Sequence, residues 1–218
     1  MMIRGNLNTA PEKPTLMRSS QKIVFRPAQI VAMLVSLSIA IVSGCASVVV
    51  GGGAAVGTAA YQERGVQGVA RDIATATRMR TNLLNAGEDF VTGVGVEVYE
   101  GRLLLTGMLP TEDMQAQTVG MAWKTEGVKD VLNEIQTGST NLRDFAKDSW
   151  ITTQLHSRIT LDEKILAINY SVETVNGLIY LIGIAQNQTE LNRVIAHAKS
   201  IGYVKRIINH VRIKKGAS

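Results

Sequence analysis

Hydrophobic and polar positions in the last two thirds of the chain follow a pattern that occurs twice, the second copy 76 residues after the first. Each copy opens with apolar residues at every fourth position, as in Ile151, Leu155 and Ile159, which predicts an amphipathic helix. A stretch of alternating apolar and polar residues follows at 94–98 and again at 168–172. This alternation predicts a half-buried strand in each copy.

The first predicted strand of each copy ends at a two-residue turn, Glu100-Gly101 or Asn176-Gly177. Asn-Gly favours a type I′ hairpin, because both central residues of that turn need a positive φ. A second strand, a polar stretch that begins another helix, and a third strand complete the unit. The order is αββαβ, and we predict an α+β fold with two helices on one face of a three-stranded sheet in each copy.

A gapless shift by 76 residues places chemically matching residues opposite one another. The matched pairs include Asp72 with Asp148, Glu97 with Glu173, Gly107 with Gly183, Lys129 with Lys205, and Asn133 with Asn209. We predict two tandem domains at 70–138 and 148–215, with 139–147 as the linker and the start of the next helix. A core of this size is marginal, so the copies are expected to pack together or to rely on a tether.

The beginning of the chain reads as a secretion signal. Basic residues precede an apolar run at 30–42, which is shorter than the roughly 20 residues of a membrane-spanning helix. The run ends in Ser43-Gly44-Cys45, which resembles a bacterial lipobox. The resemblance implies that 1–44 is a signal peptide, that cleavage occurs before Cys45, and that Cys45 carries acyl chains, palmitate included, on its sulfur and amine.

Translation of this leader can start at Met1 or Met17. In the lipoprotein pattern, Ala46 after the modified cysteine implies transport to the outer membrane. Residues 45–69 are rich in glycine and alanine and are expected to be a flexible tether. Cys45 is the single cysteine, which excludes an internal disulfide and a multi-cysteine zinc site.

The net charge of +5 is distributed unevenly along the chain. Residues 1–44 hold five basic residues and one acidic residue, so most of the excess belongs to the leader. This location argues against a nucleic-acid partner. Residues 72–138 hold five basic and ten acidic residues, whereas 148–218 hold nine basic and five acidic residues. The second copy, at +4, is therefore the one that can approach an anionic membrane.

Trp150 is the strongest candidate for a binding residue. It lies about 100° around the helix from Ile151, off the predicted buried stripe, and its equivalent in the first copy is Ala74. Its polar neighbours on that helix are Arg143, Lys147, Gln154 and Arg158. An indole among cations suits a lipid interface, with the cations on the phosphates. The alternative is that Trp150 packs between the two domains.

The second-strand segments EGRLLLTG and NGLIYLIG, together with the run DSWITT at 148–153, resemble the BON domain. Two such units behind a lipobox resemble the family of dual-BON outer-membrane lipoproteins. That resemblance implies a non-enzymatic protein that faces the periplasm, binds anionic phospholipid through the first helix of its second domain, and supports envelope integrity. The alternative is a periplasmic adaptor that binds an envelope protein involved in outer-membrane assembly or cell-wall remodelling.

Motifs for catalysis or cofactor binding are missing from the sequence. No nucleophile elbow, zinc-protease motif or dinucleotide fingerprint occurs. His156, His197 and His210 lack metal-ligand spacing and are expected at the surface. Trp123 is expected to contact a partner or the other domain. We therefore predict no enzyme activity, no cofactor and no metal.

Overall fold

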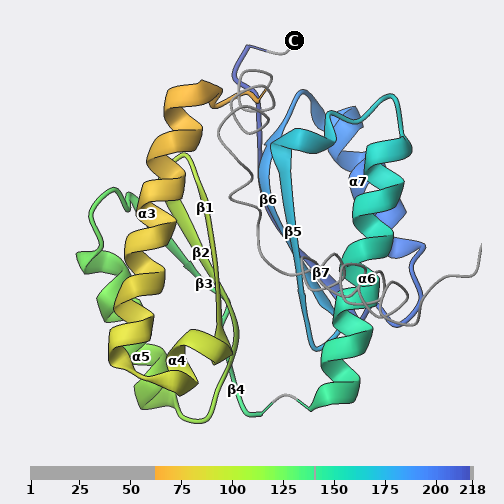
Figure 1. Cartoon of the computed structure of the whole chain (residues 1–218). Helices are drawn as coiled ribbons and strands as arrows, with labels where there is room; N and C mark the ends of the chain where they lie inside the picture. Colours follow the sequence, from red (N-terminus) through yellow and green to blue (C-terminus); the bar gives the residue numbers. More distant parts are fainter. Residues whose placement is uncertain (1–61, 140, 217–218) are drawn as a thin grey trace, which may run out of the picture. The chain divides into compact units, whose positions relative to one another are not determined.

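The structure, a computed structural model, describes residues 62–139 and 141–216. These residues form two domains of the same design, and the helices of each domain cover one face of its sheet (Figure 1). The predicted α+β class is confirmed. None of the described helices has the length and apolar character needed to cross a membrane. The predicted leader, Cys45 and most of the predicted tether lie outside the described residues.

Domain 1 has more elements than the sequence pattern predicts. Its elements are α3 (Gly65–Ala86), α4 (Glu88–Gly93), β1 (Val94–Tyr99), β2 (Arg102–Leu109), α5 (Glu112–Lys124), β3 (Asp130–Asn133) and β4 (Gln136–Thr137). β1 is antiparallel to β2, while β3 and β4 both run parallel to β2. The extra elements, α4 and β4, are six and two residues long, too short to show a period of their own.

Domain 2 follows the predicted order. Its elements are α6 (Leu142–Leu161), the short 3₁₀ helix η2 (Ala167–Asn169), β5 (Tyr170–Val175), β6 (Leu178–Ala185), α7 (Gln188–Lys199) and β7 (Arg206–Ile213). β5 is antiparallel to β6, and β7 is parallel to it, so β6 is the central strand. The parallel pair requires a crossover connection, which α7 provides.

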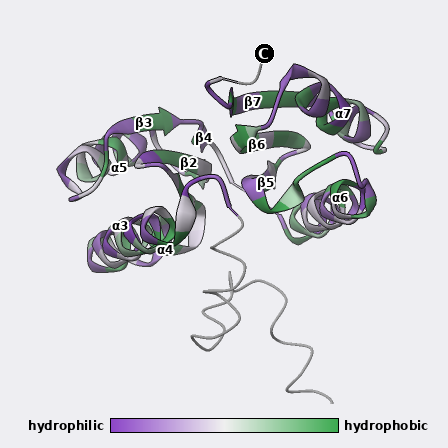
Figure 2. Cartoon of the chain, turned by 90° about the horizontal axis from the view of Figure 1, so that it is seen from above, coloured by the Kyte–Doolittle hydropathy of each residue, from purple (hydrophilic) through white to green (hydrophobic). Residues whose placement is uncertain are grey.

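Each domain has its own hydrophobic core between helices and sheet. In domain 2, Ile151, Leu155 and Ile159 of α6 are fully buried with Leu181 of β6 in one cluster. Figure 2 shows the resulting division, with green and purple residues on the same helix and mainly green residues along β6. Burying one such aliphatic side chain stabilises the fold by about 1.5–3 kcal/mol, so this stripe fixes the orientation of α6.

The two hairpin turns have the backbone conformation that the sequence predicts. Glu100 and Gly101 have φ values of 56° and 78°, and Asn176 and Gly177 have values of 52° and 75°. A buried aspartate lies under each turn and accepts hydrogen bonds from both turn N–H groups. Asp148 does so at 2.6 and 2.8 Å in domain 2, tying α6 to the β5–β6 hairpin.

A third group of buried residues joins the domains. It contains Tyr99 and Leu104 from domain 1, and Tyr180, Ile182 and Ile184 from domain 2. The predicted packing of the two copies on each other is thus present within the described residues.

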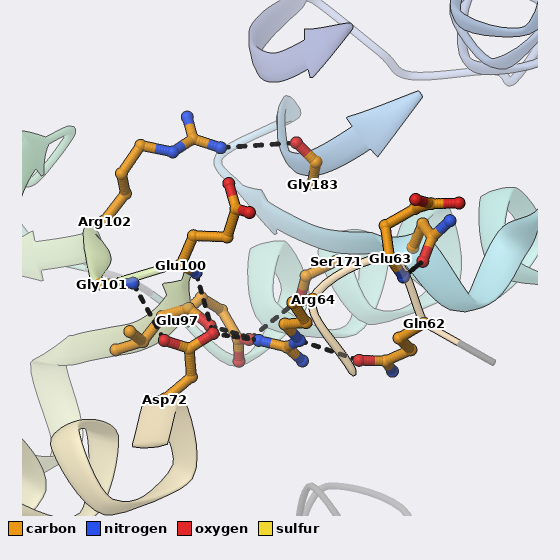
Figure 3. Close-up of polar contacts among 12 residues, drawn as sticks. Gln62, Glu63, Arg64, Asp72, Glu97, Glu100, Gly101, Arg102, Ser171 and Gly183 are labelled. Carbon is orange, nitrogen blue, oxygen red and sulfur yellow. Dashed lines mark hydrogen bonds and ion pairs between the residues drawn. The ribbon is translucent and has the colours of Figure 1, made fainter. Parts of the chain in front are cut away.

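Polar contacts accompany this apolar cluster, and Figure 3 shows several of them. The buried guanidinium of Arg102 donates to the carbonyl oxygens of His210, at 2.7 Å, and Gly183, at 3.4 Å. The hydroxyl of Ser171 donates to the carboxylate of Glu97 at 3.0 Å. These contacts fix the register of one domain on the other.

The segment before α3 also contacts domain 2. The N–H of Glu63 donates to Asn169 at 3.0 Å, and its carboxylate accepts from Gln186 and Lys214. The next residue, Arg64, donates to Asp72 at 2.7 Å (Figure 3). Its guanidinium also lies over the ring of Tyr99 within domain 1. These contacts order the chain early enough for α3 to begin at Gly65, five residues before the predicted domain boundary.

Candidate functional site

The candidate site lies on the solvent-facing side of α6. The helix begins after Asn141, whose side chain accepts a hydrogen bond from the N–H of Asp144 at 3.0 Å. This is the usual role of an N-cap residue, which satisfies one of the free N–H groups at a helix start. Asp148 and Thr152 then attach the helix to the hairpin, the latter through Thr174 at 2.8 Å. These hydrogen bonds hold α6 in place on the domain, and with it the side chains on its solvent-facing side.

Trp150 is exposed on this side of α6, with 43% of its surface accessible. Its ring lies edge-on to that of Tyr203, with the centroids 6.1 Å apart and an angle of 73° between the planes. Tyr203 follows α7 in the same domain and is itself 72% exposed. Trp150 lies outside the buried cluster that joins the domains. The pair instead presents two amphipathic rings to solvent.

Tyr203 and Leu161 belong to this face, although neither is among the residues that the sequence predicts for it. Leu161 lies eleven residues after Trp150, within about 20° of it around the helix, and is 82% exposed. Tyr203 has a positive φ of 68°, which is uncommon for a bulky residue. A signal existed for it, because the shift by 76 places Tyr203 opposite Gly127, just as Trp150 lies opposite Ala74.

The predicted cations lie around Trp150 and differ in exposure and in their polar contacts. Arg143 is exposed and lies about 20° from Trp150 around the helix. Lys147 is half-buried and lies 3.5 Å from the carboxylate of Asp144. Arg158 donates to the hydroxyl of Ser200 at the end of α7. The structure thus brings the predicted set onto one side of α6, and Arg143 is its most accessible cation.

Gln154, the remaining predicted residue, is half-buried about 40° from Trp150. The loop that carries Tyr203 adds a cation that is not among the residues predicted for this face. Lys205 is exposed, and its ammonium donates to the side chain of Asn176 at 2.7 Å. The face therefore combines exposed rings with amines and guanidinium groups on the more basic domain.

The three histidines, which the sequence predicts at the surface, are exposed to different degrees. His156 is the most exposed of the three, and partial desolvation of its imidazole lowers its pKa. His197 and His210 are half-buried, and each lies 2.8 Å from a carboxylate oxygen, of Asp162 and Glu134 respectively. Both side chains still reach the surface, and the sequence does not indicate their carboxylate partners because these are distant along the chain. No metal-binding group of His, Cys, Asp and Glu occurs among the described residues.

Two further residues with predicted roles lie outside the α6 helix. Trp123 is 57% exposed near the end of α5 and lies outside the cluster that joins the domains. Cys45, the predicted lipidation site, lies outside the described residues.

The fold and its repeated hairpin, with an aspartate under each turn, define a small domain that occurs twice. A family model for the BON domain matches residues 71–139 and 147–215, and the chain belongs to this family. A second family model, described as a protein of unknown function (DUF3568), matches residues 29–79.

Several known proteins are similar in sequence. An uncharacterised protein in the gshII 5′ region of Anaplasma centrale is 38% identical over 145 residues, covering 66% of this chain and 95% of that protein. The outer membrane lipoprotein DolP of Haemophilus influenzae is 29% identical over 184 residues, covering 84% and 94%. The 21 kDa hemolysin of Actinobacillus pleuropneumoniae is 31% identical over 122 residues, covering 55% and 63%. The chain is thus similar to DolP over both BON domains.

Proposed function

We propose that this protein is a lipid-anchored protein of the bacterial outer membrane that binds anionic phospholipid with the outer side of α6 and supports envelope integrity without catalysing a reaction. The binding face consists of Trp150, Tyr203 and Leu161, with Arg143, Lys147, Gln154, Arg158 and Lys205 around them. We name these residues the α6 face.

The observation that carries the proposal is the exposed Trp150–Tyr203 pair beside cations. Tryptophan and tyrosine prefer the membrane–water interface, where the ring is in the apolar layer and the polar atom meets the headgroups. Each basic side chain near an anionic surface adds about 1 kcal/mol. The charge of residues 148–218, nine basic against five acidic residues, favours the same partner.

The anchor is the second part of the proposal. The lipobox-like sequence at Cys45 supports lipidation, and the similarity to a protein named outer membrane lipoprotein supports the location. Several acyl chains hold a protein firmly on a membrane, since each buried CH₂ contributes about 0.8 kcal/mol. Mass spectrometry of the mature protein should find a triacylated Cys45 at the N-terminus, and Cys45→Ala should leave the precursor uncleaved. A wild-type protein that keeps residues 1–44 would contradict this part.

The α6 face can be tested separately with residues 46–218 and vesicles. We expect binding to vesicles that contain phosphatidylglycerol, no binding to phosphatidylcholine alone, and a loss of binding at high salt. Trp150→Glu should weaken binding more than tenfold, because it removes an apolar ring and adds a negative charge at the surface. Co-sedimentation with vesicles measures both effects.

The chain contains a matched control for this substitution. Trp123→Glu replaces an exposed tryptophan of domain 1 in the same way and should change binding less than twofold. Melting of the Trp150→Glu protein should shift little, because the ring is already exposed. Equal losses in both variants, or unchanged binding in Trp150→Glu, would sink the assignment of the α6 face.

A further inference from the structure

Domain 1 contains a cavity at the position that the aromatic pair occupies in domain 2. The cavity measures about 580 Å³ and lies between α3, the β1–β2 turn and the loop that joins α5 to β3. Ala74, Gly101 and Gly127 are among its lining residues, with the charged side chains of Arg71 and Lys129. Its size falls within the range of sites that bind small ligands or single side chains.

The equivalence of the two places rests on the backbone as well as on the sequence shift. Gly127 and Tyr203 both have positive φ values, of 94° and 68°, at the same point after the second helix. Asp72 accepts from both N–H groups of its turn, at 2.8 and 2.9 Å, as Asp148 does in domain 2. The framework is therefore the same, and what differs is that Ala74 and Gly127 replace two aromatic residues.

A side chain at Gly127, the position of Tyr203 in domain 2, has no room to fill this space. A Cβ atom at Gly127 would collide with the hydroxyl oxygen of Thr75, and that hydroxyl is held by the carbonyl of Glu126 at 3.3 Å. Arg64, which also lines the cavity, is held by Asp72, by the carbonyl of Val98 at 2.9 Å and by the ring of Tyr99. The cavity is thus open in the structure, and neither Gly127 nor Arg64 occupies it.

The charges at the cavity indicate what can enter it. Arg71 and Lys129 are exposed and form no ion pair within the described residues. Glu126 lies 3.4 Å from Arg78, and Asp72 is already paired with Arg64, so two of the three acids there are partly neutralised. The cavity therefore has a small excess of basic residues, four against three acidic ones. The domain around it, residues 62–139, has a net charge of −4. An anionic membrane repels such a domain, whereas a single side chain can still reach the cavity.

We propose that this cavity binds an aromatic side chain of a partner protein, flanked in that partner by carboxylates. The ring would take the place that Trp150 takes in domain 2, in contact with Ala74 and within reach of a guanidinium. Cation–π contact with arginine stabilises such a ring, and the carboxylates would pair with Arg71 and Lys129. The proposal goes beyond lipid binding, since it assigns a protein partner to the other domain.

The test uses the full chain in a neutral maltoside detergent and a capped tripeptide of 5-fluorotryptophan between two glutamates. Fluorine NMR reports binding through line broadening. Ala74→Trp should fill the cavity from within and weaken peptide binding at least tenfold, without lowering the melting temperature. Ala116→Trp adds the same side chain to the exposed side of α5, outside the cavity, and should leave binding unchanged.

Two further arms examine the chemistry of the ligand. Arg71→Glu should weaken binding at least fivefold, and this exposed substitution decides the matter if Ala74→Trp fails to fold. A capped tripeptide of alanine between two glutamates should not displace the probe, and one of tryptophan between two lysines should bind at least fivefold more weakly. Unchanged binding in a folded Ala74→Trp protein, or in Arg71→Glu, would overturn the proposal. Displacement by the alanine peptide would also overturn it, because the ring would then be irrelevant.

Discussion

At the scale of single residues, the buried aspartate under each hairpin turn connects the first helix of a domain to its sheet. Asp148 is almost completely buried, and its two oxygens accept from the N–H groups of Asn176 and Gly177. Both N–H groups belong to the two-residue turn, beyond the last residue pair of the β5–β6 ladder, so the ladder does not satisfy them. A carboxylate is well suited here, because hydrogen bonds to a charged acceptor are stronger than neutral ones.

Replacing this carboxylate should destabilise domain 2. In Asp148→Asn the side chain keeps one acceptor and gains an N–H₂ group that faces a backbone donor. Hydrogen bonds to a charged group contribute about 1.5–3 kcal/mol each, so we expect a loss of about 2–3 kcal/mol in the free energy of unfolding. Urea denaturation measures it, with the exposed Glu163→Gln as the control. A loss below 0.5 kcal/mol would contradict this role.

At the scale of elements, α7 shows how side chains start a helix and attach it to the sheet. The side chain of Asn187 accepts from the N–H of Glu190 at 2.9 Å. The buried carboxylate of Glu190 in turn accepts from Gln186, Leu166 and the hydroxyl of Tyr170. This reciprocal arrangement is close to a capping box. These hydrogen bonds fix the direction in which α7 crosses the sheet, as the connection between β6 and β7.

Removing the N-cap side chain should destabilise α7 more than α6. Asn187→Ala leaves the N–H of Glu190 without its acceptor and should cost about 1 kcal/mol of stability. Asn192→Ala removes the same side chain from the exposed middle of the helix and should change stability by less than half as much. Thermal unfolding of the two variants side by side measures the difference, and equal effects would show that the cap is unimportant.

Regular elements such as α6 can be predicted from the sequence, whereas irregular loops and contacts between distant segments cannot. The stripe of Ile151 and Leu155 identifies α6 and leaves Trp150 outside it, because helical spacing separates them whatever the tertiary context. Tyr203 lies in a loop without any period, and only the comparison of the two copies could select it. Contacts such as Glu97 with Ser171 join residues far apart in sequence, and no local pattern connects them. The fold was thus more predictable than the full site.

At the scale of the whole molecule, two equivalent acids are found where the domains meet. Glu97 of β1 and Glu173 of β5 are both half-buried, and Arg80 of α3 lies 3.9 Å from Glu97. Burial raises the pKa of Glu97. Burial, and then the negative charge of Glu97, raises the pKa of Glu173 to about 7. Ser171, Arg80 and Arg64 oppose the shift at Glu97.

This pair should make the stability of the folded chain depend on pH. Glu173 binds a proton more tightly when folded than when unfolded, so stability should fall as the pH rises from about 4.5 to about 7. Each unit of pKa corresponds to 1.36 kcal/mol, so the fall can reach about 3 kcal/mol. Urea denaturation across this range should show the slope, and Glu173→Gln should flatten it. An unchanged slope in that variant, equal to that of Glu163→Gln, would contradict the assignment.

The contacts of Glu63 with domain 2 have a consequence for how strongly the α6 face needs to bind. They fix the point from which the chain leaves the folded part, next to both domains, and only residues 46–61 separate that point from Cys45. Seventeen steps of chain span at most about 60 Å. For a chain anchored through Cys45 as proposed, the α6 face is confined to a thin layer above one membrane. Its second attachment is then intramolecular, at an effective concentration in the millimolar range. In the anchored protein, the α6 face can therefore set the orientation of the domains toward the membrane. It can do so even with an affinity too low to hold an unanchored domain on a vesicle.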